Sequence, residues 1–128
     1  MKISIEEVIC CNECYIVKFS TEFGNAVAFW KGDKPATNYN CHVELDINDI
    51  LVWDRDIIKK TDNGNFTIRK ENNNIFITGN LESVDDDGYS ILRFGESIIP
   101  FMATGEYFEV GTGIEIRTKT ISLSPVTY

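Results

Sequence analysis

Four cysteines and a single histidine are the residues of this chain best suited to metal binding or covalent chemistry. Cys11 and Cys14 have C-x-x-C spacing, and Cys41 is followed directly by His42. Structural zinc takes four tetrahedral Cys or His ligands, which two such pairs could supply. However, the sequence has no second C-x-x-C, and adjacent residues of a strand point to opposite faces. We therefore expect no metal and no cofactor, and we expect reduced cysteines that are buried as small apolar side chains.

The histidine and the cysteines do not form a recognisable catalytic set. A redox C-x-x-C is expected at a helix N-terminus in a βαβ context, which the sequence around Cys11 lacks. On an enzymatic interpretation, His42 would be the general base, beside Cys41 or Glu44. In a strand, though, Cys41 and His42 cannot both reach one substrate atom. The sequence also has no nucleophile elbow, phosphate-binding glycine loop or metalloprotease helix, so we predict that the protein is not an enzyme.

Apolar and acidic residues alternate between positions 43 and 48, which predicts a carboxylate stripe on one face of a strand. The apolar residues at odd positions point inward, and the acidic and amide residues at even positions point outward. The stripe leads into Trp53-Asp54-Arg55-Asp56, which adds a large aromatic ring. Hot spots favour Trp, Tyr and Arg, and acidic patches speed association with basic partners. We predict a partner-binding site of Glu44, Asp46, Asp49, Trp53, Asp54 and Asp56; the alternative is an ordinary solvated sheet face.

The remaining charged and aromatic residues indicate less specific roles. The run Asp85-Asp86-Asp87-Gly88 is too short for an EF-hand loop and predicts a charged hairpin turn. Aromatic residues are numerous enough for base stacking, but positive charges are few and flanked by acids. The net charge of −8 also disfavours nucleic acid as a partner. Most rings are expected in the core, with Trp30 and Trp53 as the best candidates for exposure.

Length and composition indicate one globular domain. At 128 residues with 43% hydrophobic residues, the chain can bury a core without metals or disulfides. The N-terminus lacks the apolar segment of a signal peptide, and no apolar run approaches the length of a membrane span. We therefore expect a cytoplasmic protein with no membrane partner. No linker, repeat or low-complexity tract is visible, so residues 1–128 are predicted to form a single all-β domain.

Short runs rich in β-branched and aromatic residues, bounded by Gly, Asn, Asp or Pro, predict about ten strands. They are expected at 2–9, 14–20, 25–30, 42–53, 65–70, 75–82, 89–94, 97–101, 113–118 and 121–124. Turns are predicted at 61–65, 71–74 and 85–88, and the longest loop at 31–40. At most one short helix is expected, within 46–51 or 103–108.

This number and spacing of strands indicates an antiparallel β-barrel, with a β-sandwich as the alternative. The run Gly79-Asn80-Leu81-Glu82, followed by 88–94, resembles a strand pair of the oligonucleotide/oligosaccharide-binding (OB) barrel. The run 110–116, with Ser124-Pro125, is similar to the last strands of that barrel. The resemblance covers the C-terminal half and implies an OB-like barrel.

The overall profile resembles the immunity proteins of bacterial polymorphic and contact-dependent toxin systems. The residues that carry the resemblance are 23–30, 43–47, and 85–94 with its Gly88 turn. Such proteins are small, acidic, cytosolic and non-catalytic, and they block the active site of a toxin that is often a basic nuclease. The resemblance implies a protein-binding domain that neutralises a basic toxin through an acidic surface. An OB-type binder of oligonucleotide or oligosaccharide, and a structural subunit or homodimer, stay open as alternatives.

Overall fold

The regular elements of the protein are all β-strands in residues 1–60 and 65–126, which are the residues described by a computed structural model. The predicted all-β class is therefore confirmed. The strands are β1 (Lys2–Cys11), β2 (Cys14–Thr21), β3 (Gly24–Trp30), β4 (Tyr39–Ile47), β5 (Ile50–Val52), β6 (Ile57–Lys59), β7 (Thr67–Glu71), β8 (Asn74–Val84), β9 (Tyr89–Phe94), β10 (Ser97–Thr104), β11 (Gly113–Thr118) and β12 (Ile121–Pro125).

The observed strands differ from the predicted ones mainly between residues 42 and 60. The stretch expected as one strand at 42–53 forms β4 and β5, because Asn48 and Asp49 leave the strand pairing at the junction. The sequence does not predict the three-residue strand β6. Neither 46–51 nor 103–108 is helical. Within the described ranges, no helical segment has the length and apolar character needed to cross a bilayer.

The predicted turns are confirmed where the structure describes them. The turn at 71–74 connects β7 to β8, and the turn at 85–88 connects β8 to β9. Gly88 has a φ of 90°, a left-handed conformation that glycine adopts without steric cost. The predicted turn at 61–65 lies, apart from its last residue, outside the described residues. The predicted loop at 31–40 is shorter than expected, because β4 already begins at Tyr39.

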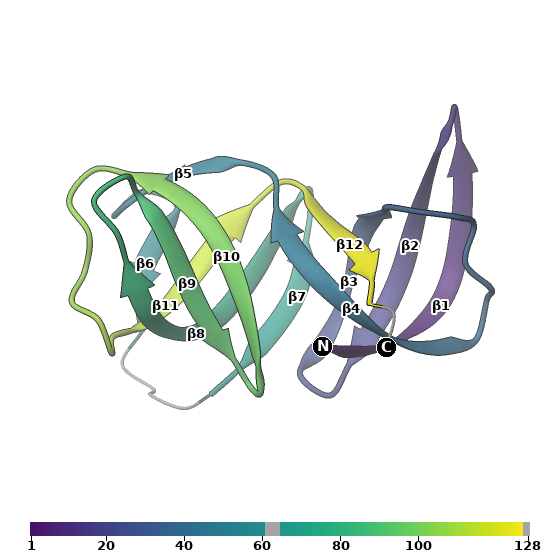
Figure 1. The fold of residues 1–128 in the computed structure, drawn as a ribbon, viewed down its shortest axis with the longest axis horizontal. Helices are drawn as coiled ribbons and strands as arrows, with labels where there is room; N and C mark the ends of the chain where they lie inside the picture. Colours follow the sequence, from purple (N-terminus) through teal and green to yellow (C-terminus); the bar gives the residue numbers. More distant parts are fainter. Residues whose placement is uncertain (61–64, 127–128) are drawn as a thin grey trace.

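Five strands close into a barrel that forms lobe 1, on the right of Figure 1. β1, β2 and β3 form an antiparallel meander, and β4 pairs with the other side of β1. β12 closes the ring, because it pairs parallel to β3 and antiparallel to β4. The resulting order, β1-β2-β3-β12-β4, is consistent with an OB-like barrel. The predicted barrel type is therefore confirmed.

Lobe 2, formed by β5–β11, repeats this strand order. β8, β9 and β10 form a second antiparallel meander, and β11 pairs with the other side of β8. β5 lies parallel to β10, and β6, which follows β5 in the chain, lies antiparallel to β11. β7 pairs with β8 and reaches lobe 1 through Gly24 of β3. The C-terminal segments that resemble an OB barrel in sequence thus contribute mainly to lobe 2, whereas the closed ring is mainly N-terminal.

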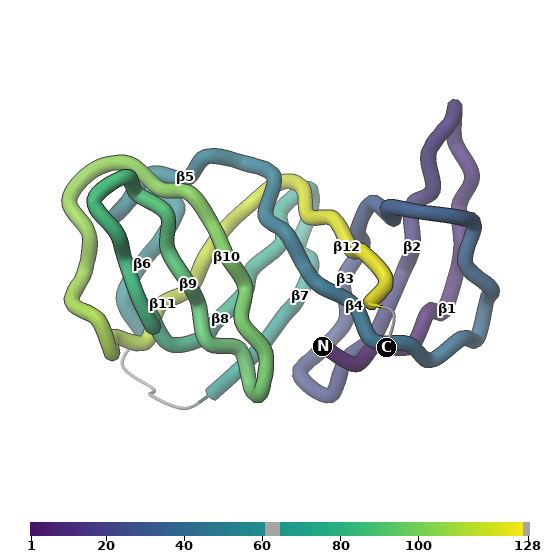
Figure 2. Tube along the Cα trace, in the orientation of Figure 1, coloured from purple at the N-terminus to yellow at the C-terminus, as the bar shows by residue number. Residues whose placement is uncertain are grey.

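Each lobe is completed by a strand from the other half of the chain. The segment 39–52 leaves lobe 1 as β4 and enters lobe 2 as β5, as the tube in Figure 2 shows. The segment 113–125 makes the opposite passage, from β11 to β12. The two segments run antiparallel where they meet, with Ile47 opposite Ile121. One strand order thus occurs twice, with the last strands exchanged, although no repeat is evident in the sequence.

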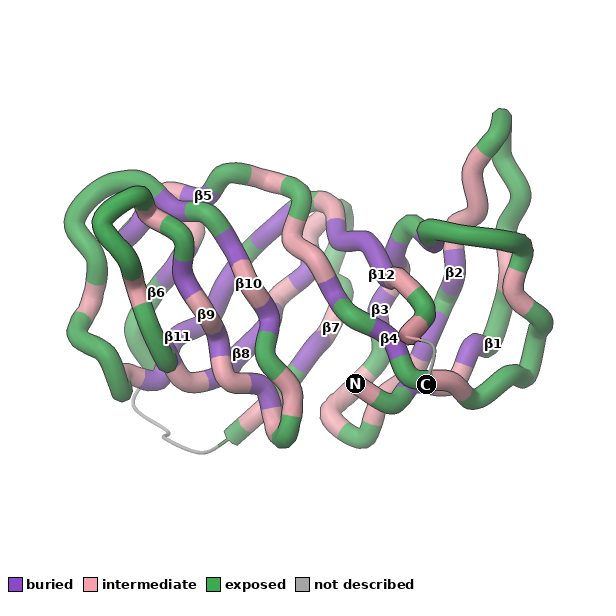
Figure 3. The backbone as a smooth tube through the Cα atoms, viewed as in Figure 1, coloured by how far each residue is buried: buried purple, intermediate pink, exposed green. Residues whose placement is uncertain are grey.

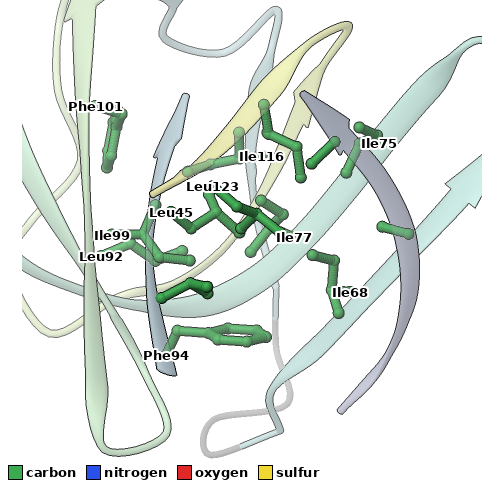
Figure 4. Close-up of a cluster of buried hydrophobic side chains, with 14 of the residues drawn as sticks. Leu45, Ile68, Ile75, Ile77, Leu92, Phe94, Ile99, Phe101, Ile116 and Leu123 are labelled. Carbon is green, nitrogen blue, oxygen red and sulfur yellow. The ribbon is translucent and has the colours of Figure 1, made fainter. Parts of the chain in front are cut away.

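One hydrophobic core extends through both lobes. Along most strands, buried residues alternate with more exposed ones, as Figure 3 shows. Leu45 and Leu123, which pair across β4 and β12, lie beside Ile99 and Leu92 of lobe 2 in Figure 4. The buried apolar residues of the two lobes belong to a single cluster. The two lobes are therefore packed against one another.

Gly24 forms the direct backbone contact between β3 and β7, and we predict that its replacement is costly. A Cβ atom at Gly24 would lie 2.0 Å from the Ile68 carbonyl oxygen, and Gly24 has a φ of +138°. We expect Gly24→Ala to lower the free energy of unfolding by roughly 3 kcal/mol or more, because steric overlap adds to the cost of positive φ. Urea denaturation measures this loss.

Gly111 provides the matched control, because its φ is +98° and a Cβ there would meet nothing within 4 Å. Gly111→Ala should cost only about 1 kcal/mol, from backbone conformation alone. Equal losses in the two variants would show that the contact with Ile68 does not constrain the fold.

Candidate binding surface

The outer surface of β9, β10 and β5 carries apolar side chains where a solvated sheet face would carry polar ones. On β9 and β10, alternate residues are buried, and the residues between them point away from the core. In the strand register, Tyr89 lies opposite Met102, and Met102 lies beside Ile50 of β5. Because paired residues place their Cβ atoms about 5 Å apart, these three side chains form a row across three strands.

Further apolar residues extend this row along β9 and β10. Ile91 lies opposite Pro100, and Ile98 lies opposite Arg93. The exposed fraction is 69% for Ile50, 50% for Ile98 and 46% for Tyr89. Neighbouring large apolar side chains with this exposure are typical of a contact surface. We call the set the β9–β10 face; it consists of Ile50, Val52, Tyr89, Ile91, Ile98, Pro100 and Met102.

Acidic residues border the β9–β10 face at both ends of its strands. The run 85–87 lies in the β8–β9 turn and is separated from Tyr89 only by Gly88. Asp85 Oδ1 accepts hydrogen bonds from the backbone N–H groups of Asp87 and Tyr89, at 2.9 and 3.0 Å. These bonds fix the turn, and Asp86 and Asp87 remain exposed. At the other end, Glu96 is exposed in the β9–β10 turn.

The acidic strand β4 lies alongside β10, at the front of the molecule in Figure 1. Its outward-pointing acids are Glu44 and Asp46. Asp46 Oδ2 is 3.7 Å from Lys31 Nζ, whereas Glu44 has no basic group within ion-pair distance among the described residues. On the β8 side, Glu82 accepts two hydrogen bonds from Arg93, the shorter at 2.8 Å. The β9–β10 face is thus bordered by carboxylates, some of them without a basic partner.

The predicted alternation along β4 is confirmed. Val43 and Leu45 are buried, Ile47 packs against the core, and Glu44 is exposed. The six residues predicted as one site do not share one surface, however. Glu44 and Asp46 lie on lobe 1, and Asp54 is exposed in the β5–β6 turn of lobe 2.

Asp49 lies at the point where the two exchanged segments pass, and hydrogen bonds occupy both of its carboxylate oxygens. Oδ2 accepts from Thr118 Oγ1 at 2.7 Å and from the Lys119 backbone N–H at 2.8 Å. Oδ1 accepts from Thr120 Oγ1 at 3.4 Å. Burial alone would raise the pKa of Asp49, but these hydrogen bonds together lower it. Asp49 therefore joins the two segments and is not available as a partner-binding charge.

Asp56 is also engaged within the fold. Its carboxylate accepts hydrogen bonds from Arg55, the Val52 backbone N–H at 2.9 Å, and Arg117 Nη2 at 3.3 Å. The hydrogen bonds from Arg55 are the main cause of its lowered pKa. Because the side chain is only 11% exposed, Asp56 ties the β5–β6 turn to β11 and offers little charge to a partner.

The expectation that Trp30 and Trp53 are exposed is wrong. Trp53 is only 5% exposed, and its ring packs edge-on against Phe101 and Phe108, with centroids 5.9 and 5.2 Å away. Trp30 is also buried, and its Nε1–H donates to the Asp33 carbonyl oxygen at 2.9 Å. The polar neighbours of Trp53 in sequence are turn residues, while the ring itself points into lobe 2. Trp53 therefore cannot anchor a partner in the predicted way.

The expectation of buried cysteines is wrong as well. Cys10 and Cys11 are exposed, and Cys14 and Cys41 are half-buried free thiols. In the strand register, His42 lies opposite Lys2 and Cys41 lies opposite Ile3. Among the described residues, no group of three or more His, Cys, Asp or Glu side chains is arranged to hold a metal ion.

Hollows of the described structure also lie outside the β9–β10 face. A cleft of about 770 Å³ is lined by residues of both lobes, including Lys2, Glu22, His42 and Glu96. A smaller apolar groove of about 170 Å³ is lined by β2–β3 residues, by the end of β7, and by the turn between β11 and β12. Phe29, Lys70 and Lys119 are among its lining residues, and the Lys70 amine donates to the Asn72 carbonyl oxygen at 2.8 Å.

Comparison with known proteins identifies no relative of the chain. No protein-family model matches it, and neither does any curated protein or solved structure. Function is therefore inferred from the fold and its surface alone.

The sequence contains one signal for the β9–β10 face. From Ile98 to Ala103 the chain is apolar at six consecutive positions, without the alternation seen in β4. Such a run predicts a strand that is apolar on both faces. One face packs on the core, and the other is an apolar surface that is either covered by another element or exposed to solvent. Pro100 is compatible with this strand because β5 pairs with β10 only from Met102 onward.

We predict that Asp49→Asn lowers the free energy of unfolding by about 1–2 kcal/mol at neutral pH, as the loss of charged hydrogen bonds does. Because the pKa of Asp49 is lower in the folded state, its stabilisation is fully present above the ordinary value of 3.8. It is lost as pH falls through the lower folded-state pKa. The difference between wild type and variant should therefore shrink in acid, as urea denaturation across pH measures.

Asp54→Asn is the matched control, since Asp54 is exposed and makes no side-chain hydrogen bond within the described structure. It should leave the free energy of unfolding within about 0.5 kcal/mol of wild type. A pH-independent difference for Asp49→Asn would contradict the role of its charge.

Proposed function

We propose that this protein is a non-enzymatic protein-binding domain of the bacterial cytoplasm that neutralises a basic toxin, in the manner of an immunity protein. The observation that carries the proposal is the β9–β10 face, where large apolar side chains are exposed together inside a border of carboxylates. The fold supplies this surface on a packed scaffold, so little conformational entropy is lost when a partner docks.

The two parts of the surface have different roles in the proposed complex. The apolar centre supplies affinity, because Tyr89, Met102 and Ile50 leave water together when a partner covers them. The acidic border supplies partner choice and association rate, since carboxylates such as Glu44 and Asp86 attract a basic surface at a distance. The net charge of −8 acts in the same direction. The partner should therefore present an apolar projection surrounded by Lys and Arg.

The probe for this proposal is the protein encoded by the reading frame next to this chain's own gene. We expect that protein to arrest growth when produced alone, and we expect co-production of this chain to restore growth. In titration calorimetry, Ile50→Ser and Tyr89→Ala should each weaken binding by about tenfold or more, as the loss of a contact hot spot does. Tyr107→Ala is the matched control, because Tyr107 is 58% exposed but lies in the loop between β10 and β11.

The acidic border is tested in the same complex by reversing charge. Glu44→Lys should slow association and reduce its dependence on salt, while Glu109→Lys, the same change in the β10–β11 loop, should have less effect. Binding that is indifferent to both apolar variants would reject the β9–β10 face as the contact. If the neighbouring product is neither toxic nor bound, the toxin-neutralising function is rejected. If the chain alone elutes as a dimer from a sizing column and Ile50→Ser converts that dimer to a monomer, the β9–β10 face is a self-association surface.

The groove beside Phe29 favours a second candidate function, an OB-type binder of a small anionic or sugar ligand. In register, Ile9, Ile16 and Phe29 form an apolar row on the outer face of β1–β3. Phe29 is 39% exposed, and Lys70 and Lys119 border the same groove. A stacked ring with flanking amines is the arrangement by which such barrels hold single bases.

Titration with a short oligonucleotide and with an oligosaccharide tests this second function. A bound ligand should change the fluorescence of Trp30, which follows Phe29 in β3. Phe29→Ala should weaken that binding by about tenfold, the usual effect of removing one stacking ring. Unchanged fluorescence with both ligands would dismiss the groove as such a site.

A further inference from the structure

The β1–β2 hairpin ends in two cysteines whose sulfur atoms nearly touch. Cys11, the last residue of β1, pairs with Cys14, the first residue of β2, and only Asn12 and Glu13 separate them. Their Sγ atoms lie 3.1 Å apart, and both residues are free thiols. A disulfide requires an S–S distance of about 2.05 Å, so small side-chain rotations would bring the atoms to bonding distance.

The backbone also suits a bond between these residues. Directly opposed residues of antiparallel strands have Cα atoms about 4.5 to 5.5 Å apart, which lies within the range that disulfides span. Glu13 holds the tight turn with a φ of 62°, a left-handed conformation uncommon for a residue of its type. Closing the bond therefore requires no movement of the strands.

The site is open to reagents in solution. Cys11 is exposed, and Cys14 is half-buried at the same end of the hairpin. This end of the hairpin projects from lobe 1 at the upper right of Figure 1. The hydrogen bond between Cys11 and Cys14 is the main reason that the pKa of the Cys14 thiol is raised. Access and proximity together distinguish this pair from the other two cysteines.

We propose that Cys11 and Cys14 form a reversible redox site that a low-molecular-weight disulfide, such as oxidised glutathione, converts to an intramolecular disulfide. Cys11 Sγ loses its proton and attacks one sulfur of the small disulfide, which forms a mixed disulfide and releases a thiolate that takes up that proton. The Cys14 thiol then loses its proton and attacks Cys11 Sγ, which releases the second thiol. Two protein thiols are oxidised and one small disulfide is reduced to two thiols, so atoms and electrons balance.

The remaining cysteines provide internal controls. Cys10 lies opposite Tyr15, one position away from Cys11 and therefore on the other face of the hairpin. Cys41 lies on β4, opposite Ile3 of β1. Neither residue has another cysteine sulfur in contact within the described structure. Each should therefore remain a thiol or carry a single glutathione adduct, without an internal partner.

The experiment incubates the folded wild-type chain with oxidised glutathione, blocks the remaining thiols with an alkylating reagent, and measures intact and peptide masses. We expect wild type to lose two hydrogens and to yield a peptide linked between Cys11 and Cys14, and a dithiol reductant should reverse both changes. Cys11→Ser and Cys14→Ser should each lose that link, and the remaining partner cysteine should retain a glutathione adduct. Cys10→Ser and Cys41→Ser should behave as wild type does.

Three results would overturn the proposal. The first is a wild-type chain in which Cys11 and Cys14 are both alkylated after treatment. The second is a stable adduct on Cys11 that Cys14 does not displace, and the third is a link to Cys10, Cys41 or a second chain. The variants at Cys10, Cys11 and Cys14 remain testable as folded proteins because these residues lie outside the core, and Cys41, which packs against the core, is only half-buried. The outcome is independent of whether the β9–β10 face binds a partner.

Discussion

The fold depends on the place where two segments of the chain pass from one lobe to the other in opposite directions. There, Asp49 accepts hydrogen bonds from the residues that connect β11 to β12. The amide of Asn48 donates to Ser122 Oγ at 2.8 Å, and its backbone N–H donates to the Thr120 carbonyl oxygen. Without these bonds, polar groups at the junction of two apolar lobes would lose their partners. The junction therefore fixes the register of β4 on β12 and the position of β5 on β10.

The same junction determines which side chains reach the surface. The passage of 39–52 between the lobes places β4, with its outward-pointing acids, alongside β10. It also delivers Ile50 to the edge of the β9–β10 face, next to Met102. Asp49 and Asp56 belong to the same predicted site as Glu44, but their carboxylates accept hydrogen bonds within the fold and stabilise the arrangement of these strands. One acidic stretch of the sequence thus supplies both exposed carboxylates and carboxylates that hold the fold together. Contacts with residues distant in sequence decide which role each carboxylate has.

The strands could be predicted from sequence because their signals are local. Alternation in β4 and turn residues after β7 and β8 placed most boundaries within a few residues. The pairing could not be predicted, because β12 joins β3 and β4 across most of the chain. The repeated strand order leaves a weak sequence similarity between Ile16-Val17-Lys18-Phe19 and Ile91-Leu92-Arg93-Phe94. These segments lie in β2 and β9, the middle strands of the two meanders. The ion pair between Asp56 and Arg117 joins residues 61 positions apart, and no local pattern around Trp53 reveals that its ring is enclosed.

Exchange of the last strands has a consequence for how the molecule denatures. Lobe 1 without β12 has no closed ring, and lobe 2 without β5 and β6 exposes the sides of β10 and β11. Because one hydrophobic cluster extends through both lobes, melting either lobe exposes apolar surface of the other, so neither survives as an intermediate. Calorimetric and spectroscopic transitions should coincide in a single all-or-none step, despite the bilobal outline of the chain.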